Sequence, residues 1–348
     1  MKFAVFSIGY HLPHSTGGAP MPTRTGLEDI VGLAEEVECL GFDAYGIGER
    51  HGPPFLASSP AVLLGAVAAR TSAIRLMTTV TVLSAMDPVR AAEDFATLDN
   101  LSGGRLELVI GKGNDPGMLG LFGVREGELW DRLAENYALL RRLWSEQDVH
   151  WSGRFRTPLQ GATVTPRPCQ NHIRVWHGSA TSLHSADLAA RHGDPLFTAN
   201  GSQPMEKYRV LVEHYRERWE HYGRPAADAV VGAGSVFHVA RTSQQARKQY
   251  GPVYAFLAGT AAARRNRSPF QDLDDAIRHG PLMVGSPQQV IEKVHLAHQA
   301  YGHQLLGLTV DGLPPAERRD SLELFAADVA PVLRQELPDS LPMRQDGT

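Results

Sequence analysis

The sequence predicts an α/β protein built as a (β/α)8, or TIM, barrel with insertions. Strand-like and helix-like segments alternate along the chain, and no two long strands follow each other through a two-residue turn. This alternation is typical of βα units with a parallel sheet, and eight such units close most economically as a barrel. The predicted strands cover residues 2–9, 43–49, 74–82, 106–112, 173–178, 195–199, 231–239 and 305–311.

Helix boundaries between these strands follow from capping residues. Thr25 with Glu28 has the spacing of a capping box, and Gly41 is expected to end the same helix. Asp87-Pro88 combines an N-cap residue with a proline suited to the first turn, and Ser286-Pro287 repeats the combination. A long helix is predicted from the apolar positions Leu129, Leu133, Tyr137, Leu140 and Trp144.

Two insertions interrupt the regular alternation. Residues 147–172 contain aromatics, threonines and three prolines, which predicts a short hairpin or an extended excursion. Residues 258–284 form a long insertion near the expected barrel opening, a place typical of a lid or a dimer contact. We expect a single domain over residues 1–336 and a flexible tail over residues 337–348.

Composition excludes several classes of partner and location. A net charge of −4 and a pI of about 6.4 give no basic field for nucleic acid or an anionic membrane. The longest apolar run, residues 61–69, is far shorter than the ~20 residues of a bilayer span. Cys39 and Cys169 lack metal or redox spacing, and the N-terminus is predicted to be a strand rather than a secretory signal, so a cytoplasmic protein is expected.

Glu49, Arg50 and His51 directly follow the second predicted strand. Barrels present catalytic groups at the C-terminal ends of their strands, so these three are the candidate catalytic residues. The alternative is that a Glu49–Arg50 ion pair caps the strand and leaves His51 in solvent.

Two further strand ends favour an anion such as phosphate. Lys112 lies between Gly111 and Gly113 after the fourth strand, so exposed backbone N–H groups flank a cation. Gly178, Ser179, Ala180 and Thr181 follow the fifth strand at the start of a helix, where free N–H groups and the helix dipole favour negative charge. The alternatives are a tight turn with a surface lysine and ordinary Ser/Thr capping.

Other common sites are not indicated. The chain has neither a GxGxxG motif after its first strand nor a GxSxG motif. The pairs His11/His14 and His295/His298 lack a carboxylate cluster, so no metal is predicted. A Schiff-base aldolase would need a desolvated lysine at a strand end, which leaves only Lys112.

The chain resembles the bacterial-luciferase-like flavin-dependent oxidoreductases. MKFAVFSIGY is similar to the first strand of that family, and LGFDAYGIGERH resembles its GFD-aromatic-x-x-x-EHH segment. DPVRAAEDFATLDNLSGGRLELVIGKG resembles its HPxRxxEDxxxLDxxSxGRxxxGxxRG segment, and FGV and LMVGSPQQVIEKV match later landmarks. The similarity covers roughly residues 1–335. It implies a barrel, usually dimeric, that binds reduced FMN non-covalently and supplies it to dioxygen.

The resemblance also implies roles for individual residues. Lys112 stands where the family has an arginine to the FMN phosphate, and residues 178–181 match the phosphate loop of the family. Arg132 is a further phosphate candidate. Thr79 and Val80 match the segment beneath the isoalloxazine ring.

The sequence departs from the family motif at Arg50. Glu49 and His51 match the glutamate and second histidine of the EHH motif, whereas Arg50 replaces the histidine important for flavin hydroperoxide chemistry in the luciferases. Arginine does not deprotonate in proteins, so Arg50 cannot act as that base. Light-emitting aldehyde oxidation is therefore disfavoured. Arg50 is expected to orient an anionic substrate or to stabilise the hydroperoxide, with His51 as acid/base.

Three functional hypotheses follow. The first is a monooxygenase that receives reduced FMN from an NAD(P)H:flavin reductase and, through a flavin hydroperoxide, oxygenates a small organic substrate by hydroxylation, epoxidation or insertion. The second, ranked lower, is a deazaflavin-dependent hydride transferase of the same fold, whose larger cofactor tail would favour a more basic opening than Lys112 alone gives. The third is a non-catalytic flavin-binding relative, suggested by Arg50 and opposed by the retained Glu49 and His51.

Overall fold

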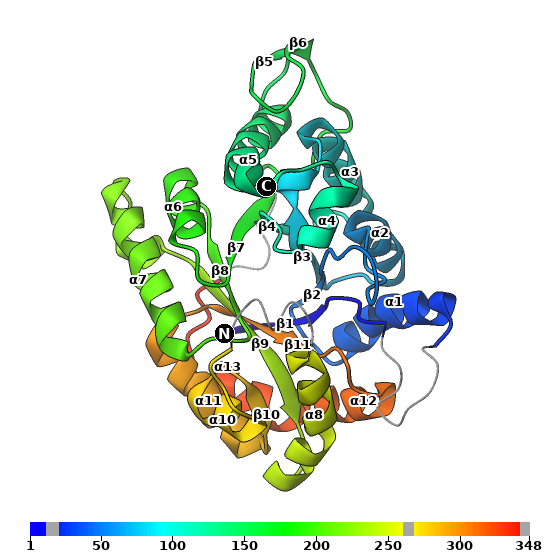
Figure 1. Ribbon diagram of the computed structural model, residues 1–348, viewed down its shortest axis with the longest axis vertical. Coiled ribbons are helices and arrows are strands. Elements are labelled where there is room, and N and C mark those ends of the chain that lie inside the picture. Colours follow the sequence, from blue (N-terminus) through cyan, green and yellow to red (C-terminus); the bar gives the residue numbers. More distant parts are fainter. Residues whose placement is uncertain (12–20, 260–267, 342–348) are drawn as a thin grey trace.

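The structure is a computed structural model, and it describes residues 1–11, 21–259 and 268–341. Within these residues eight parallel strands form a closed barrel surrounded by helices (Figure 1). The pairing order is β9-β11-β1-β2-β3-β4-β7-β8, and β8 pairs with β9 to close the barrel. The barrel strands are β1 (Lys2–Ser7), β2 (Ala44–Ile47), β3 (Arg75–Val82), β4 (Leu106–Gly111), β7 (Arg174–Ser179), β8 (Leu196–Asn200), β9 (Val231–Val239) and β11 (Leu305–Thr309). All eight predicted strands are confirmed.

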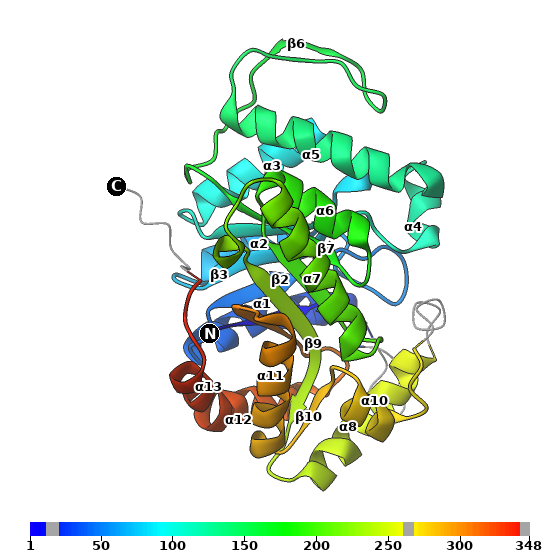
Figure 2. The same ribbon diagram turned by 90° about the vertical axis from the view of Figure 1, so that its left-hand side faces the viewer.

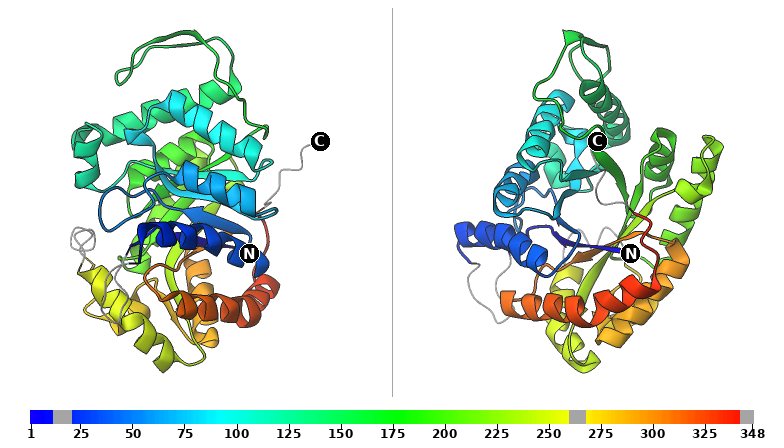
Figure 3. Two further views of the ribbon diagram at one scale, coloured as in Figure 1. Left: turned by 90° about the vertical axis from the view of Figure 1, so that its right-hand side faces the viewer. Right: turned by 180° about the vertical axis from the view of Figure 1, so that it is seen from behind.

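Helices cover the outside of the barrel. Their bounds are α1 (Thr23–Cys39), α2 (Pro60–Arg70), α3 (Pro88–Leu101), α4 (Pro116–Leu121), α5 (Leu129–Ser145), α6 (Leu183–His192), α7 (Met205–His221), α8 (Ser243–Ala258), α10 (Leu273–His279), α11 (Pro287–Tyr301), α12 (Pro315–Leu324) and α13 (Ala330–Glu336). The last helix of the ring, α12, lies beside α1, where the ion pairs Arg318–Asp29 and Arg319–Glu36 join the two (Figure 3).

Two of the three predicted N-caps are confirmed. The Asp87 carboxylate accepts from the N–H groups of Val89 and Arg90, and the Ser286 hydroxyl accepts from the N–H of Gln289. The predicted capping box of Thr25 and Glu28 is wrong. Helix α1 begins at Thr23 without a side-chain cap, and Glu28 instead pairs with Arg24 one turn earlier.

Residues 147–172 contain the predicted hairpin. It consists of β5 (Val149–Trp151) and β6 (Leu159–Ala162), which pair antiparallel and extend beyond α5 (Figure 2). Part of the insertion 258–284 lies outside the described residues. The described part contains α10 and β10 (Met283–Gly285), which pairs with the outer end of β9. A lid or dimer role for this insertion stays a prediction.

We call the face where the C-terminal ends of the barrel strands lie the mouth, and the opposite face the base. The barrel interior is packed with side chains, including Phe6, Met77, Trp176 and Phe197, and Leu341 joins this inner cluster. Such packing is typical of a barrel core rather than a pore. A single domain over residues 1–336 and a tail after it stay predictions. None of the described helices is long and apolar enough to cross a bilayer.

Candidate active site

The segment that follows β2 places Glu49 and His51 in contact at the mouth. Glu49 Oε1 lies 2.9 Å from His51 Nε2, and Glu49 Oε2 accepts a 2.8 Å hydrogen bond from the N–H of Val82. The two side chains are only 13% and 11% exposed. The Glu49–Arg50 ion pair considered as the alternative is not found among the described residues, because both oxygens of Glu49 have other partners.

This contact determines which nitrogen of His51 can exchange a proton. A carboxylate at Nε2 favours the tautomer that carries its proton there, so Nδ1 is left as the acceptor. Among the described residues, Nδ1 has no hydrogen-bond partner. The ring of Phe122 packs edge-on against His51, with centroids 4.6 Å apart. Glu49 therefore orients the imidazole, and Nδ1 is the atom available for acid/base chemistry.

Arg50 points away from this pair and crosses the mouth. Its Nη1 donates a 2.8 Å hydrogen bond to Oδ1 of Asn114, which lies beyond the end of β4. Its guanidinium carbon is 5.7 Å from the centroid of the Phe55 ring. Arg50 and Phe122 thus connect the segment after β2 with the segment after β4 across the end of β3.

The end of β3 contributes the two residues predicted to lie beneath a flavin ring. The register with β4 shifts between Thr79 and Thr81, and the Thr79–Val80 peptide bond is cis. A Cβ atom added at Gly178 would lie 2.8 Å from Val80 Cγ1, and one added at Gly111 would lie 3.0 Å from Val80 Cγ2. Val80 therefore occupies the space that glycines leave open at the ends of β4 and β7. The structure brings these three predicted strand ends together.

Lys112 is half-buried beside this surface. Its Nζ donates to the Gly113 carbonyl oxygen at 3.1 Å and lies 5.6 Å from the centroid of the Trp130 ring. Among the described residues no carboxylate lies within 4.0 Å of it. Burial lowers the pKa of Lys112, and the negative charge of Glu126 partly opposes that shift. The ammonium group is therefore partly desolvated and lacks a counter-ion from the described chain.

The phosphate loop predicted after β7 leads into α6. The N–H of Ser182 donates to Ser179 Oγ at 2.9 Å, and Ser185 Oγ donates to the Gly178 carbonyl. The N–H groups of Ala180 and Thr181 have no acceptor in the described part of the chain. The loop is thus held by its serines while its amides remain free for an anion.

Trp130 links Lys112 with the start of α6, and the sequence analysis did not identify it. Its ring packs near Lys112 Nζ, and it also lies 5.0 Å from the ring of His184 in the first turn of α6. The available signal was weak: an aromatic residue one position off the buried face of α5. Asn114, Phe55 and Phe122 were also missed, since their relevance depends on contacts between distant segments.

Arg132 lies apart from these contacts. Its Nε is 3.2 Å from Glu128 Oε2, and its guanidinium carbon lies 4.7 Å from the ring centroid of Phe155 in the β5–β6 hairpin. Glu128 also pairs with Arg125. The guanidinium of Arg132 therefore already has a carboxylate partner, and its predicted phosphate role stays a prediction. In the described residues no group of three or more His, Cys, Asp or Glu side chains is arranged to hold a metal ion.

The fold and the site define a (β/α)8-barrel protein with an oriented imidazole and a half-buried lysine at its mouth. The chain belongs to the luciferase-like monooxygenase family, whose sequence profile matches residues 1–304. The resemblance inferred from the motifs is therefore confirmed.

Individual relatives cover most of the chain. The 4-hydroxyprotoasukamycin monooxygenase of Streptomyces nodosus subsp. asukaensis is 27% identical over 318 residues, covering 86% of this chain and 85% of that protein. The crystal structure of the monooxygenase RslO1 from Streptomyces bottropensis superposes with a TM-score of 0.83 at 26% identity, covering 95% of this chain and 99% of that one. An F420-dependent glucose-6-phosphate dehydrogenase of Nakamurella multipartita is 32% identical over 208 residues, covering 57% of this chain and 60% of that protein. Monooxygenases and deazaflavin-dependent enzymes are thus both among its relatives.

Proposed function

We propose that this protein is a monooxygenase that takes reduced FMN from a separate NAD(P)H:flavin reductase and uses dioxygen to oxygenate a small organic substrate. The observation that carries the proposal is the half-buried Lys112, which lacks a carboxylate partner and shares the Trp130 ring with the first turn of α6. A buried cation without a counter-ion is costly, so a bound phosphate would stabilise it.

The residues at the mouth fit FMN in three respects. Lys112 and the free amides of residues 180 and 181 would hold the phosphate. Gly178 leaves room for the side chain of Val80, the residue proposed to lie beneath the flavin ring, and an added Cβ would displace that side chain. Thr79 Oγ1 is buried and has no hydrogen-bond partner, so a polar edge of the flavin ring would satisfy it.

When bound, reduced FMN supplies the electrons that activate dioxygen for transfer of one oxygen atom to the substrate. The protein contributes position and proton exchange. Glu49 holds His51 in one tautomer, and His51 takes or gives a proton at Nδ1. Phe122 covers the imidazole and limits access of water, which protects a reactive site from side reactions. By family resemblance, we also propose a cytoplasmic homodimer.

An anaerobic titration with reduced FMN tests the cofactor. We expect Lys112→Met to lower the affinity at least tenfold, because a charge-assisted contact to phosphate is lost. Lys248→Met is the matched control, since Lys248 is an exposed lysine on α8. Equal affinity for reduced FMN in wild type and Lys112→Met would contradict the phosphate assignment.

Mixing the reduced complex with oxygenated buffer tests the chemistry. We expect oxidised flavin to appear more slowly in the complex than with free reduced FMN, because the mouth shields the reacting flavin. The second candidate, deazaflavin-dependent hydride transfer, is favoured by the F420-dependent relative. Binding of a reduced deazaflavin by a protein that does not bind reduced FMN would replace the first proposal with the second.

A further inference from the structure

Arg50 is held in place at the mouth by neutral groups. Its backbone N–H donates to the Ala57 carbonyl at 2.9 Å, its Nη1 donates to Asn114 Oδ1, and its guanidinium lies over Phe55. Within residues 1–11, 21–259 and 268–341 no carboxylate oxygen lies within 4.0 Å of its nitrogens. A guanidinium has five N–H donors, and the described protein uses one of these for a hydrogen bond.

Carboxylates close to this segment are occupied elsewhere. Glu49 bonds to His51 and to the N–H of Val82. Asp311, at the end of β11, accepts from Ser7 Oγ at 2.9 Å and from the N–H of Ile8 at 2.8 Å. Neither acid forms an ion pair with Arg50, and no other carboxylate of the described residues does so.

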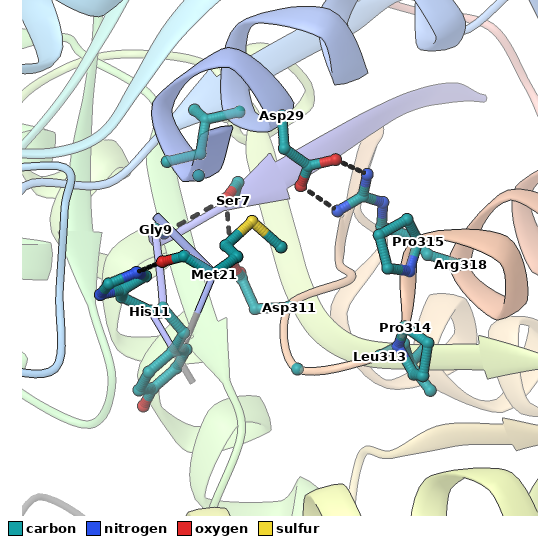
Figure 4. Close-up of a pocket in the computed structure, with 14 residues that line it drawn as sticks. Ser7, Gly9, His11, Met21, Asp29, Asp311, Leu313, Pro314, Pro315 and Arg318 are labelled. Carbon is teal, nitrogen blue, oxygen red and sulfur yellow. Dashed lines mark hydrogen bonds and ion pairs between the residues drawn. The ribbon is translucent and has the colours of Figure 1, made fainter. Parts of the chain in front are cut away.

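The wall beside Arg50 is built on the turn that Asp311 holds. Ser7, Tyr10 and Asp311 are among the residues that line a cavity of about 80 Å³. Figure 4 shows the hydrogen bond between Ser7 and Asp311 there. Beyond this turn, Tyr10 forms an isolated antiparallel bridge with Phe55, and their ring centroids are 4.8 Å apart. Tyr10 is half-buried; burial raises the pKa of its phenol, and the charge of Arg50 opposes that shift. A neutral phenol, an aromatic face and a guanidinium thus line one side of the mouth.

Arg50 and His51 serve different parts of the opening although they are adjacent in the chain. Nδ1 of His51 is free for proton exchange, whereas Arg50 extends toward Asn114 with unused donors. The cofactor phosphate is assigned to Lys112 and the α6 loop. A second, separate cation at the mouth is therefore available to the substrate.

We propose that the substrate is an organic acid whose carboxylate binds Arg50 while its apolar body lies along Phe55 and Tyr10. A planar guanidinium matches a carboxylate in a two-bond arrangement, which gives both affinity and orientation. This inference rests on the proposed function for the identity of the reacting partner, but the anion site itself exists without flavin.

Calorimetric titration of the flavin-free protein tests the site. The probes are two acid and amide pairs of equal shape, hexanoate with hexanamide and 3-phenylpropionate with 3-phenylpropionamide. We expect at least one acid to bind at least tenfold more tightly than its amide. Arg50→Met should abolish that preference, and Arg50→Lys should retain part of it, since lysine keeps the charge without the planar donors. Arg241→Met, which removes an exposed arginine after β9, should leave the preference unchanged.

A parallel titration with reduced FMN separates this inference from the proposed function. Arg50→Met should bind reduced FMN within threefold of wild type. The inference is overturned if neither acid is preferred over its amide, if the preference survives in Arg50→Met, or if Arg50→Met weakens FMN tenfold without changing the acid preference. Failure of wild type to bind reduced FMN would overturn the proposed function alone, because the acid and amide titrations contain no flavin.

Discussion

The mouth and the base of the barrel both contain charged side chains, but a buried carboxylate at the base and two cations at the mouth have different kinds of partner. At the base, Glu107 is completely buried and its Oε1 lies 3.1 Å from Arg75 Nε and 3.0 Å from Arg174 Nη1. Its Oε2 accepts from Trp176 Nε1 at 2.7 Å. At the mouth, Lys112 and Arg50 have only neutral partners among the described residues. Glu107 at the base is thus tied into the fold by its partners, and we propose that Lys112 and Arg50 at the mouth bind ligands.

Removing the base carboxylate should have the largest effect on stability. Glu107→Gln leaves the buried guanidinium of Arg75 without a counter-charge among the described residues, so we expect unfolding to become easier by about 3–5 kcal/mol. Urea denaturation measures the change. The matched substitution at the mouth, Lys112→Met, should change the free energy of unfolding by less than about 1 kcal/mol, because no ion pair is broken. If Lys112→Met lowered the free energy of unfolding as much as Glu107→Gln does, the contrast between the mouth and the base would be wrong.

Most of the fold could be predicted because local signals agreed with the tertiary structure. The segment 305–311, for example, reads LLGLTVD and is mostly apolar, and it forms β11 over Leu305–Thr309. The predicted capping box is wrong because the helix starts three residues earlier, with Pro22 rather than Thr25 at the N-cap position. Strand β10 was not predicted, since its three residues form a strand only by pairing with the C-terminal end of β9.

The sequence indicated which residues form the candidate site, but it did not indicate which of them contact each other. Glu49, Arg50 and His51 could be found because they follow a strand directly. That Glu49 binds His51 rather than Arg50 depends on the irregular end of β3, which supplies the N–H of Val82 to Glu49. No local sequence pattern contains that information.

Replacing Gly178 at the mouth should lower cofactor affinity as well as stability, whereas Glu107→Gln at the base is expected to lower stability. An added Cβ would meet Val80 Cγ1 at 2.8 Å and the Ile110 carbonyl oxygen at 3.2 Å, so the surface over Val80 must shift. We expect Gly178→Ala to lower reduced-FMN affinity at least tenfold while costing about 1–3 kcal/mol of stability. Fluorescence titration and urea denaturation measure the two effects.

Gly32→Ala is the control for that substitution. Gly32 lies in α1, and an added Cβ meets nothing within 4 Å. It should stabilise the protein by up to about 1 kcal/mol and leave flavin affinity unchanged. If the Gly178→Ala variant binds reduced FMN as tightly as wild type does, the surface formed by Val80 is not part of the cofactor site.

The last prediction concerns pH, and it compares a histidine at the base with the lysine at the mouth. His303, just before β11 at the base, is fully buried, and burial lowers its pKa to about 3. As pH falls below about 6.5, the unfolded chain binds a proton on this histidine and the native protein does not, so stability falls on acidification. His303→Leu should remove about 1.4 kcal/mol of the stability change between pH 6 and pH 5, measured by urea denaturation.

His150→Leu, at an exposed position in β5, should leave that change as in wild type, and an equal slope in both variants would contradict the assignment. At the mouth burial also lowers the pKa of Lys112, so alkaline pH removes its charge, and the proposed phosphate binding should weaken as pH rises.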